Sequence, residues 1–282
     1  MLNNKIDFIA IISVKNANPN GDPLNGNRPR EDINGFGEIS DVALKRKIRN
    51  RWIDMGESVF VQSDDKNVDG FKSLSERAEK NLNKIKDKSE YAKKACETWL
   101  DVRGFGQVFA FKKRKDVNDV SVGVRGPISI HPAFSIDTVN IEDIQITKSV
   151  NSEPTKDGGK SSDTIGMKHR IDFGLYVTKG SINPQLAEKT GFSDEDAEKF
   201  HQALISLFDN DSSASRPDGS MLVEKVFWFK HNSKSGQYPT FKVHDQISIK
   251  RKVDDVEPKS IEDYDVKVNR LEDLDMQEYS LR

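Results

Sequence analysis

Apolar residues alternate with a period of two from Ile6 to Lys15, which predicts a β-strand. One face of this strand carries Ile6, Phe8, Ala10, Ile12 and Val14, and the other face carries Ile9 and Ile11. A strand that is apolar on both faces usually lies inside a sheet that other elements cover. We therefore expect the first strand to be central in its sheet.

The predicted strand is followed by a run of turn-forming residues, Asn16-Ala17-Asn18-Pro19-Asn20-Gly21-Asp22-Pro23. Proline fixes φ, glycine permits positive φ, and asparagine side chains cap backbone donors. The predicted loop extends to about residue 39. Loops of this length in compact domains tend to be functional.

A helix is predicted after the loop, with Ser40 as N-cap and Gly56 as its end. Its apolar stripe at helical spacing consists of Leu44, Ile48, Trp52 and Met55. Bases lie on both sides of this stripe, with Lys45, Arg49 and, beyond them, Arg46 on one flank and Lys47 and Arg51 on the other. The helix can therefore bury one side and expose bases at both edges.

The rest of the chain predicts an α+β fold. Residues 57–100 are highly charged and indicate an insertion with a helix at 74–100, and a second helix is predicted from Ser193 to about Phe208. Further strands are predicted at residues 126–135, 141–149, 170–182, 222–232 and 243–250. The main elements then follow the ferredoxin-like βαββαβ order, which RNA-binding sheets of the RRM type use. Residues 150–166 are rich in Ser, Gly, Lys and Asp and predict a flexible stretch.

Composition limits the class of protein. No apolar run approaches the roughly 20 residues that span a bilayer, and the first residues do not form a secretory signal. The one cysteine, Cys96, forbids an internal disulfide and a zinc site built from cysteines. These features predict a cytoplasmic protein without a membrane partner.

The net charge of −2 is distributed unevenly along the chain. Residues 254–282 hold ten acids and four bases, a sum of −6, so that residues 1–253 carry +4. Residues 45–51 hold five bases and no acid. We expect the acidic end to be solvated and partly mobile, whereas the local pattern at 45–51 permits a basic groove.

The motifs that carry enzyme chemistry are weak. The five histidines lack metal-ligand spacing, and no G-x-S-x-G sequence occurs, so we expect no catalytic set, metal or cofactor. Gly159-Lys160-Ser161 lacks the upstream glycine of a P-loop. Residues 103–110 match five of the seven specified positions of the RRM octamer, but Gln107 and Ala110 replace aromatic residues. A glycine turn at the end of a helix explains this segment equally well, and Arg103 could touch phosphate there.

Three segments favour binding to a phosphate backbone. They are the basic helix at 45–51, the Arg125-Gly126-Pro127 segment that opens a strand, and the small hydroxyl residues that lead to Arg216 at 212–216. Small residues let a nucleic-acid backbone approach closely, and arginine or lysine neutralises it.

These segments resemble the backbone subunit of type I CRISPR surveillance complexes (Cascade), and the likeness is closest to the Csd subtype, type I-C. It rests on the Asn16–Pro23 loop and the helix that follows it, Ser40-Asp41-Val42-Ala43-Leu44-Lys45-Arg46-Lys47-Ile48-Arg49-Asn50. Other matching segments lie at residues 102–106, 124–127, 166–169, 174–177, 186–196 and 211–216. The resemblance therefore covers residues 5 to 250 approximately.

The resemblance implies a non-enzymatic scaffold shaped like a hand. An RRM-like palm would comprise residues 1–56, 123–147 and 171–252, with a finger-like helical insertion at 57–122, a thumb hairpin at 148–170 and an acidic extension at 253–282. Copies would stack head to tail on a CRISPR guide RNA, bind it independently of sequence and present it to target DNA. Other Cascade subunits and a recruited helicase-nuclease would be further partners.

The resemblance also implies which residues contact RNA. They are Asn20, Lys45, Arg46, Arg49, Arg103, Arg125, Met167, Lys168, Ser215 and Arg216, with Met167 near the thumb tip as the wedge that flips out a base.

Two other functions stay open from the residues alone. Asp22 and Asp32 lie in the long loop, and one aspartate with Mg²⁺ could cut RNA, as in the ribonuclease backbone subunits of type III complexes. Capping of turn amides by Asp22 after Gly21 is the simpler interpretation. The other alternative is a general single-stranded RNA-binding protein.

Overall fold

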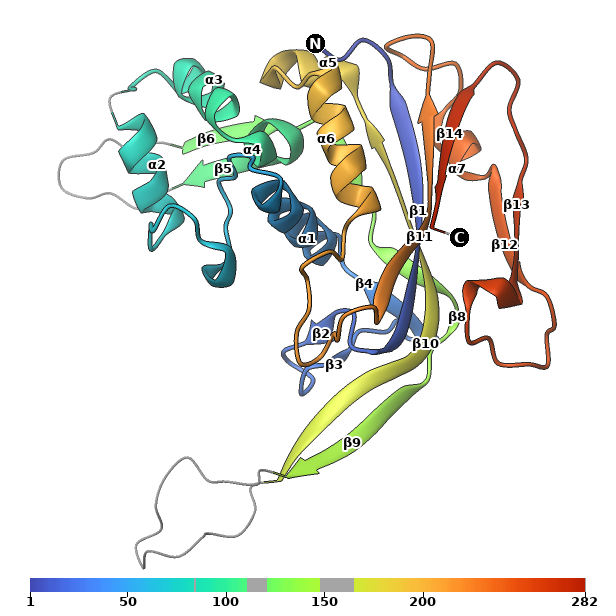
Figure 1. Ribbon diagram of the computed structural model, residues 1–282. Coiled ribbons are helices and arrows are strands. Elements are labelled where there is room, and N and C mark those ends of the chain that lie inside the picture. Colours follow the sequence, from blue (N-terminus) through green and yellow to red (C-terminus); the bar gives the residue numbers. More distant parts are fainter. Residues whose placement is uncertain (84, 111–120, 148–164, 282) are drawn as a thin grey trace, which may run out of the picture.

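The computed structural model describes residues 1–83, 85–110, 121–147 and 165–281 (Figure 1). Its centre is an antiparallel sheet with strand order β14-β11-β1-β10-β8-β4, in which β10 also pairs with β7 and β9. These strands are β1 (Ile6–Ala17), β4 (Phe36–Ile39), β7 (Ile128–Ile130), β8 (Ala133–Thr138), β9 (Ile141–Thr147), β10 (Ile165–Ile182), β11 (Met221–Lys230) and β14 (Asp275–Ser280). Helices lie between groups of these strands along the chain, and their combination with a central antiparallel sheet confirms the predicted α+β class.

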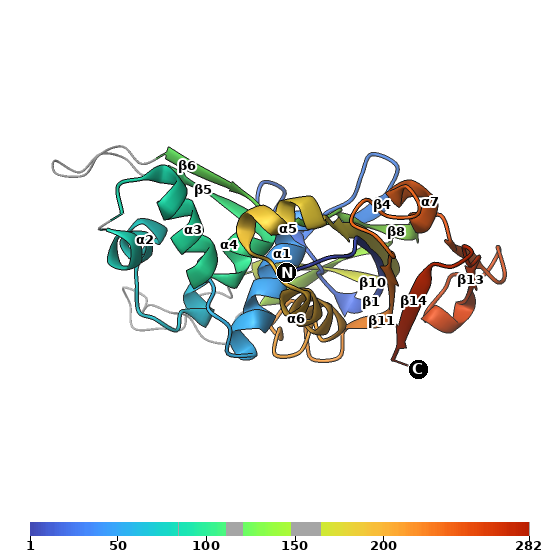
Figure 2. The same cartoon turned by 90° about the horizontal axis from the view of Figure 1, so that it is seen from above.

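The first strand is central, as its pattern predicts. β1 pairs with β10 on one side and with β11 on the other. Its two apolar faces contribute to two separate hydrophobic cores: Phe8 and Ile12 belong to one, and Ile9 and Ile11 to the other. The sheet is therefore covered on both faces, and Figure 2 shows the two layers on either side of it.

One face is covered by α1 (Asp41–Asp54), α5 (Pro184–Thr190) and α6 (Asp194–Ile205). Ser40 caps α1 by accepting a hydrogen bond from the Ala43 amide, as predicted, and Leu44, Ile48 and Trp52 are fully buried. Met55 is different, because it lies at the C-cap and is 36% exposed. The predicted stripe therefore packs over three turns and ends before its last member.

The opposite face is covered by C-terminal elements. α7 (Thr240–His244), β12 (Ile247–Arg251) and β13 (Tyr264–Val268), with the short η2 helix (Ile261–Asp263), pack against the face that carries Ile9 and Ile11. The predicted acidic end is solvated along most of its side chains, but it also packs on the sheet, because apolar residues spaced among the acids, such as Tyr264, are buried there. The predicted strand at 243–250 also starts later, since Val243 lies in α7.

Residues 57–125 form a unit beside the helical face (Figure 1). It contains η1 (Asp64–Lys66), α2 (Leu74–Leu82), α3 (Lys88–Thr98), α4 (Leu100–Phe105), β5 (Gly106–Ala110) and β6 (Ser121–Arg125), around its own core that includes Phe60, Trp99 and Phe109. The single helix predicted at 74–100 is wrong. Asp87 caps a new helix after α2, and the extended backbone of Trp99 separates α3 from α4.

Two hairpins extend from the edge of the sheet near the end of β1. The predicted long loop is partly ordered by β2 (Gly21–Asp22), which pairs with β3 (Arg28–Pro29), and it ends in β4. β9 and β10 form a longer hairpin whose ladder begins at Ile141 and Ile171, before the predicted start at residue 148. The predicted flexible stretch lies almost wholly outside the described residues. No helix in the described part of the chain is long and apolar enough to span a bilayer.

Candidate nucleic-acid interface

A polar cavity opens where four segments meet: the loop after β1, one side of α1, η1 and the turn before β11. Its volume is about 190 Å³. The residues that line it are Pro19, Asn20, Gly21, Ala43, Arg46, Lys47, Asn50, Asp65, Lys66, Asn210, Asp211, Ser212, Ser213 and Arg216. We call this the basic cavity. Four bases and two acids contribute to its wall.

Asparagine side chains in the predicted turn segment fix the shape of the basic cavity. The Oδ1 atom of Asn20 accepts hydrogen bonds from the backbone amide and the hydroxyl of Ser40, each at 2.9 Å. Asn18 donates its backbone amide to the carbonyl of Ser215 at 2.9 Å and its side-chain amide to the carbonyl of Asn27 at 2.7 Å. The loop is thereby tied to the N-cap of α1 and to the turn that carries Arg216.

A charge network lies at the back of the basic cavity. The carboxylate of Asp211 accepts from the ammonium of Lys47 and contacts the guanidinium of Arg216 at 3.3 Å. The Lys47 side chain is 7% exposed. Burial lowers the pKa of Lys47 to about 8, while Asp211 opposes this shift. Lys47 is therefore mostly protonated at pH 7, and it loses its proton as the pH rises through about 8.

The rim of the cavity holds more exposed charges. Arg46 is 61% exposed and pairs with Asp65 at 3.2 Å, and Lys66 pairs with Asp54 at 2.6 Å. Exposed pairs of this kind exchange partners at little cost. Arg46 can therefore turn toward an anion in the cavity, whereas Lys66 is held in a partly buried pair with Asp54.

The basic cavity brings together part of the predicted contact set. Asn20, Arg46 and Arg216 line it, and Ser215 lies beside Arg216 with its carbonyl bound to Asn18. Lys47, Lys66 and Asn50 also line it but were not predicted. Lys47 is visible as a base on the helix flank, but its approach to Asp211, 164 residues further along the chain, depends on the fold.

Lys45 and Arg49 lie on the flank of α1 that faces away from the basic cavity. Arg49 donates to Asp101 at 2.9 Å, and its guanidinium lies 5.2 Å from the centre of the Phe105 ring. Lys45 pairs with Asp41 at 2.9 Å. The structure thus gives Arg49 a role that was not predicted: it joins α1 to the 57–125 unit.

Arg103 is also held inside the fold. Its guanidinium donates to both carboxylate oxygens of Asp196 at 2.8 Å and to the carbonyl of Cys96 at 3.1 Å. Although burial opposes it, the hydrogen bonds from Arg103 keep the pKa of Asp196 below its usual value. Arg103 therefore clamps α4 to α6.

The remaining predicted residues lie apart from the basic cavity. Arg125 is exposed at the end of β6, opposite Gly106. Met167 and Lys168 lie in the β9–β10 hairpin, paired with Gln145 and Ile144, and Met167 is 53% exposed. They therefore belong to the stem of the hairpin, and the tip lies outside the described residues.

A polar cluster connects this stem to the loop after β1. The Asp143 carboxylate on β9 accepts from Arg28 on β3 and from the Nδ1 atom of His169 on β10, the latter at 2.6 Å. Arg28, followed by His169, holds the pKa of Asp143 below its usual range. The loop that shapes the basic cavity is thus also attached to the hairpin stem.

The two aspartates considered as catalytic groups cap turns. Asp22 accepts from the Leu24 amide at 3.1 Å and contacts Arg30 at 3.4 Å. Asp32 accepts from the amides of Asn34 and Phe36, and the bond from Phe36 contributes most to the lowered pKa of Asp32. Within the described ranges, His, Cys, Asp and Glu side chains form no group of three that could hold a metal ion.

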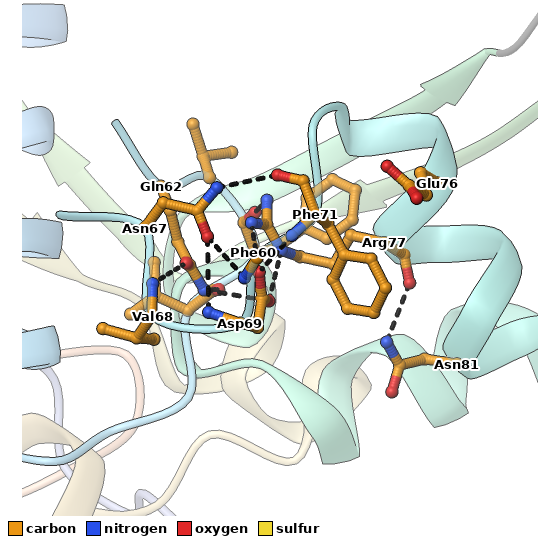
Figure 3. A network of polar contacts seen from close by, with 12 residues as sticks. Phe60, Gln62, Asn67, Val68, Asp69, Phe71, Glu76, Arg77 and Asn81 are labelled. Carbon is orange, nitrogen blue, oxygen red and sulfur yellow. Dashed lines mark hydrogen bonds and ion pairs between the residues drawn. The ribbon is translucent and has the colours of Figure 1, made fainter. Parts of the chain in front are cut away.

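The 57–125 unit contains a sequence with the spacing of an EF-hand calcium loop, formed by Asp65, Asn67, Asp69, Gly70 and Glu76. In the structure the carboxylate of Asp69, at the centre of this loop, pairs with an arginine. Arg77 donates to both oxygens of Asp69, at 2.6 and 2.7 Å, and to the carbonyl of Phe60 at 2.8 Å (Figure 3). Glu76 accepts from the Lys72 amide, so the acidic side chains do not converge. The ion pair between Asp69 and Arg77 therefore holds the conformation of this loop.

Comparison with known proteins places these features in a family. The family profile described as CRISPR-associated protein Cas7 matches residues 4–269. A curated protein named CRISPR-associated protein Cas7, from Haloferax volcanii strain DS2, is 26% identical over 217 residues. That alignment covers 70% of this chain and 62% of the relative, so the chain spans less than two thirds of the relative's length.

Two solved structures are also similar to this chain. One, titled CRISPR RNA-guided surveillance complex, is 18% identical with a TM-score of 0.45 over 80% of this chain and 68% of the other. The second, titled CRISPR RNA-guided surveillance complex, pre-nicking, is 15% identical with a TM-score of 0.45 over 80% and 78%. Because the family profile covers nearly the whole sequence, this chain belongs to the CRISPR-associated protein Cas7 family.

Proposed function

We propose that this protein is the backbone subunit of a CRISPR surveillance complex of the Cascade kind, subtype I-C, and that it binds guide RNA by its sugar-phosphate chain. One observation carries the proposal: the loop after β1, α1 and the turn before β11 form one basic cavity. Cations and small residues in a concave site suit a phosphate backbone. The membership of the Cas7 family supports the same function.

Sequence-independent binding follows from the kind of surface that is available. In the palm that we propose, β11, β1, β10 and β8 lie side by side in the ferredoxin-like order, with α1 and α6 on one face. RRM domains stack bases on the other face of such a sheet. Here α7, β12 and β13 pack against that face. The guide RNA would therefore be held at the basic cavity, with its bases free to pair with target DNA.

The proposed contact set changes in consequence. Arg46, Arg216, Lys47, Lys66 and Asn20 would form the primary phosphate site, with Ser215 beside it. Lys45 and Arg125, and Met167 and Lys168 on the hairpin, would meet RNA or a neighbouring copy outside the cavity. In this proposal the 57–122 unit is the finger, the β9–β10 hairpin is the thumb, and other Cascade subunits and a helicase-nuclease bind the filament.

The test combines RNA binding with assembly. Native mass spectrometry would be run with RNAs of increasing length, on the wild type and on the Arg46→Ala/Arg216→Ala variant. We expect the number of copies per RNA to rise stepwise with length, and the variant to bind at least tenfold more weakly, because two charge-assisted contacts are removed.

The matched control is Lys250→Ala/Lys252→Ala, which removes two bases from β12 and the residue after it, on the opposite side of the sheet. It should assemble like the wild type. A single copy bound to RNAs of every length would instead favour a general RNA-binding protein. Equal affinity of the cavity variant and the control would exclude the basic cavity as the site.

A further inference from the structure

Lys47 has an unusual position for a lysine. It lies on α1 in the wall of the basic cavity, with a 7% exposed side chain, and its ammonium is 5.4 Å from the centre of the Phe208 ring. A buried ammonium is costly unless a counter-ion and hydrogen bonds compensate for lost water. Asp211 supplies that counter-ion.

Asp211 also keeps two cations close to each other. Its carboxylate contacts both Lys47 and Arg216, and these two bases repel each other across it. Arg46, on the same helix as Lys47, is a further like charge. The charged groups that face Lys47 are therefore one acid and two bases, and the acid alone favours a protonated lysine.

We propose, on the basis of the RNA-binding function above, that Asp211 is a positioning residue: it keeps Lys47 protonated at the cavity wall, so that binding of an RNA phosphate is coupled to the proton on Lys47. A neutral amine at this position can still donate an N–H to a phosphate oxygen, but it contributes no positive charge to the contact, which is then weaker. Asp211 thereby sets the pH range over which the guide is held.

The direction of the effect follows from the pKa of Lys47, which is lowered to about 8. Below this pH the ammonium is present and the phosphate contact is complete; above it the proton is lost. If one proton is required, the dissociation constant scales as 1 + 10^(pH − 8), which gives a loss of affinity of about tenfold between pH 7 and pH 9.

The experiment measures the affinity of the full-length protein for an oligoadenylate at pH 7, 8 and 9, by fluorescence anisotropy at fixed salt. Adenine has no group that titrates in this range, so the change reports the protein. The wild type should lose about tenfold. Lys47→Arg should lose less than twofold, because a guanidinium stays charged.

Asp211 is tested in the same way. Asp211→Asn should shift the loss of affinity to lower pH, because the amide no longer favours the ammonium, and Asp211→Glu should restore the wild-type profile. Thermal unfolding of each variant separates a local effect from loss of the fold. If Lys47→Arg does not fold, the paired Asp211 variants still decide the question.

Three outcomes would overturn the inference: wild-type affinity that is constant from pH 7 to pH 9, a pH-dependent loss that persists in Lys47→Arg, or tighter binding by Asp211→Asn, which would make Asp211 a competitor of phosphate. None of them removes the RNA-binding function. A wild type that binds no RNA at any pH would instead contradict the proposed function itself.

Discussion

Two arginines that were both predicted to contact RNA, Arg46 and Arg103, have different surroundings in this protein. The position of the carboxylate that pairs with each arginine decides its role. Arg46 is 61% exposed and pairs with an equally exposed Asp65, so its charge is available to a ligand. The Arg103 side chain is 17% exposed, and its Nε and Nη2 atoms donate to the two oxygens of a buried Asp196. Arg103 is therefore part of the scaffold.

This assignment predicts a stability effect at Arg103. Arg103→Met keeps much of the side-chain volume but leaves Asp196 buried without its partner, which should lower the free energy of unfolding by about 3 kcal/mol. Urea denaturation followed by circular dichroism measures this. The double variant Arg103→Met/Asp196→Asn should recover part of the loss, because it removes the unpaired charge.

Lys94 is a suitable control for Arg103. It pairs with Glu97 on the surface of α3, with both side chains about half exposed. Lys94→Met should change stability by less than about 0.5 kcal/mol. If Arg103→Met unfolded at the same urea concentration as this control but lost affinity for RNA, Arg103 would be a phosphate ligand after all.

The bases of the site can be identified from the sequence, but the carboxylates that pair with them cannot. Helical geometry places Arg46 beyond Lys45 and Arg49 on one flank of α1, whereas in the structure Arg46 lines the basic cavity together with Lys47 from the other flank. Asp101, Asp196 and Asp211 are 52, 93 and 164 residues from the bases that they neutralise. Those pairings depend on tertiary packing, so no local pattern reveals them.

At the scale of elements, the β9–β10 hairpin projects from the end of the sheet (Figure 1). Arg28 and His169 meet at Asp143, where the β2–β3 hairpin touches its stem. The same loop binds the N-cap of α1 through Asn20. This cluster therefore joins the stem to the loop that lines the basic cavity.

We predict that Asp143→Asn broadens the distribution of distances between the β2–β3 hairpin and the stem of the β9–β10 hairpin, without unfolding the protein. Spin labels at Leu24→Cys and Gln145→Cys, two exposed positions, would report the distance between the two hairpins by pulsed electron resonance. The native Cys96 is buried, and burial raises the pKa of its thiol to about 11, so it should react little with the label.

Glu142→Gln is the matched control for the hairpin. It removes a carboxylate from the same strand, whose partner Arg170 lies within the stem itself, at 2.7 Å. Its distance distribution should match that of the wild type. A distribution for Asp143→Asn as narrow as the control would show that the Asp143 cluster does not restrict the distance between the two hairpins.

Elements with strong local signals were predictable, and those that depend on distant partners were not. β1, α1 and α6 have clear periodicity, α1 and α6 also have side-chain N-caps, and the structure confirms all three elements. The break at Trp99 has no glycine or proline to mark it. β13 and β14 lie in a strongly acidic segment, in which the charged residues conceal the apolar ones. In the folded protein, packing of these apolar residues and pairing of β14 with β11 outweigh the tendency of the charges to stay in solvent.

At the scale of the whole molecule, the C-terminal elements determine which surface is left for RNA. They cover one face of the sheet, while α1, α5 and α6 cover the other, so the concave polar site lies at the end of the sheet, between loops. The acidic end and the basic cavity are thereby kept on different sides. This separation favours contact with RNA through one side of each copy.

The central claim is that the cations of the basic cavity neutralise phosphates of the guide. The most direct measurement is the dependence of RNA affinity on salt concentration, plotted as the logarithm of the binding constant against the logarithm of salt. Each phosphate neutralised on a single strand contributes about 0.7 to the slope. The account predicts that Arg46→Ala/Arg216→Ala has a slope shallower than the wild type by about 1.4, whereas Lys250→Ala/Lys252→Ala has the wild-type slope. Equal slopes for the wild type and the cavity variant would contradict it.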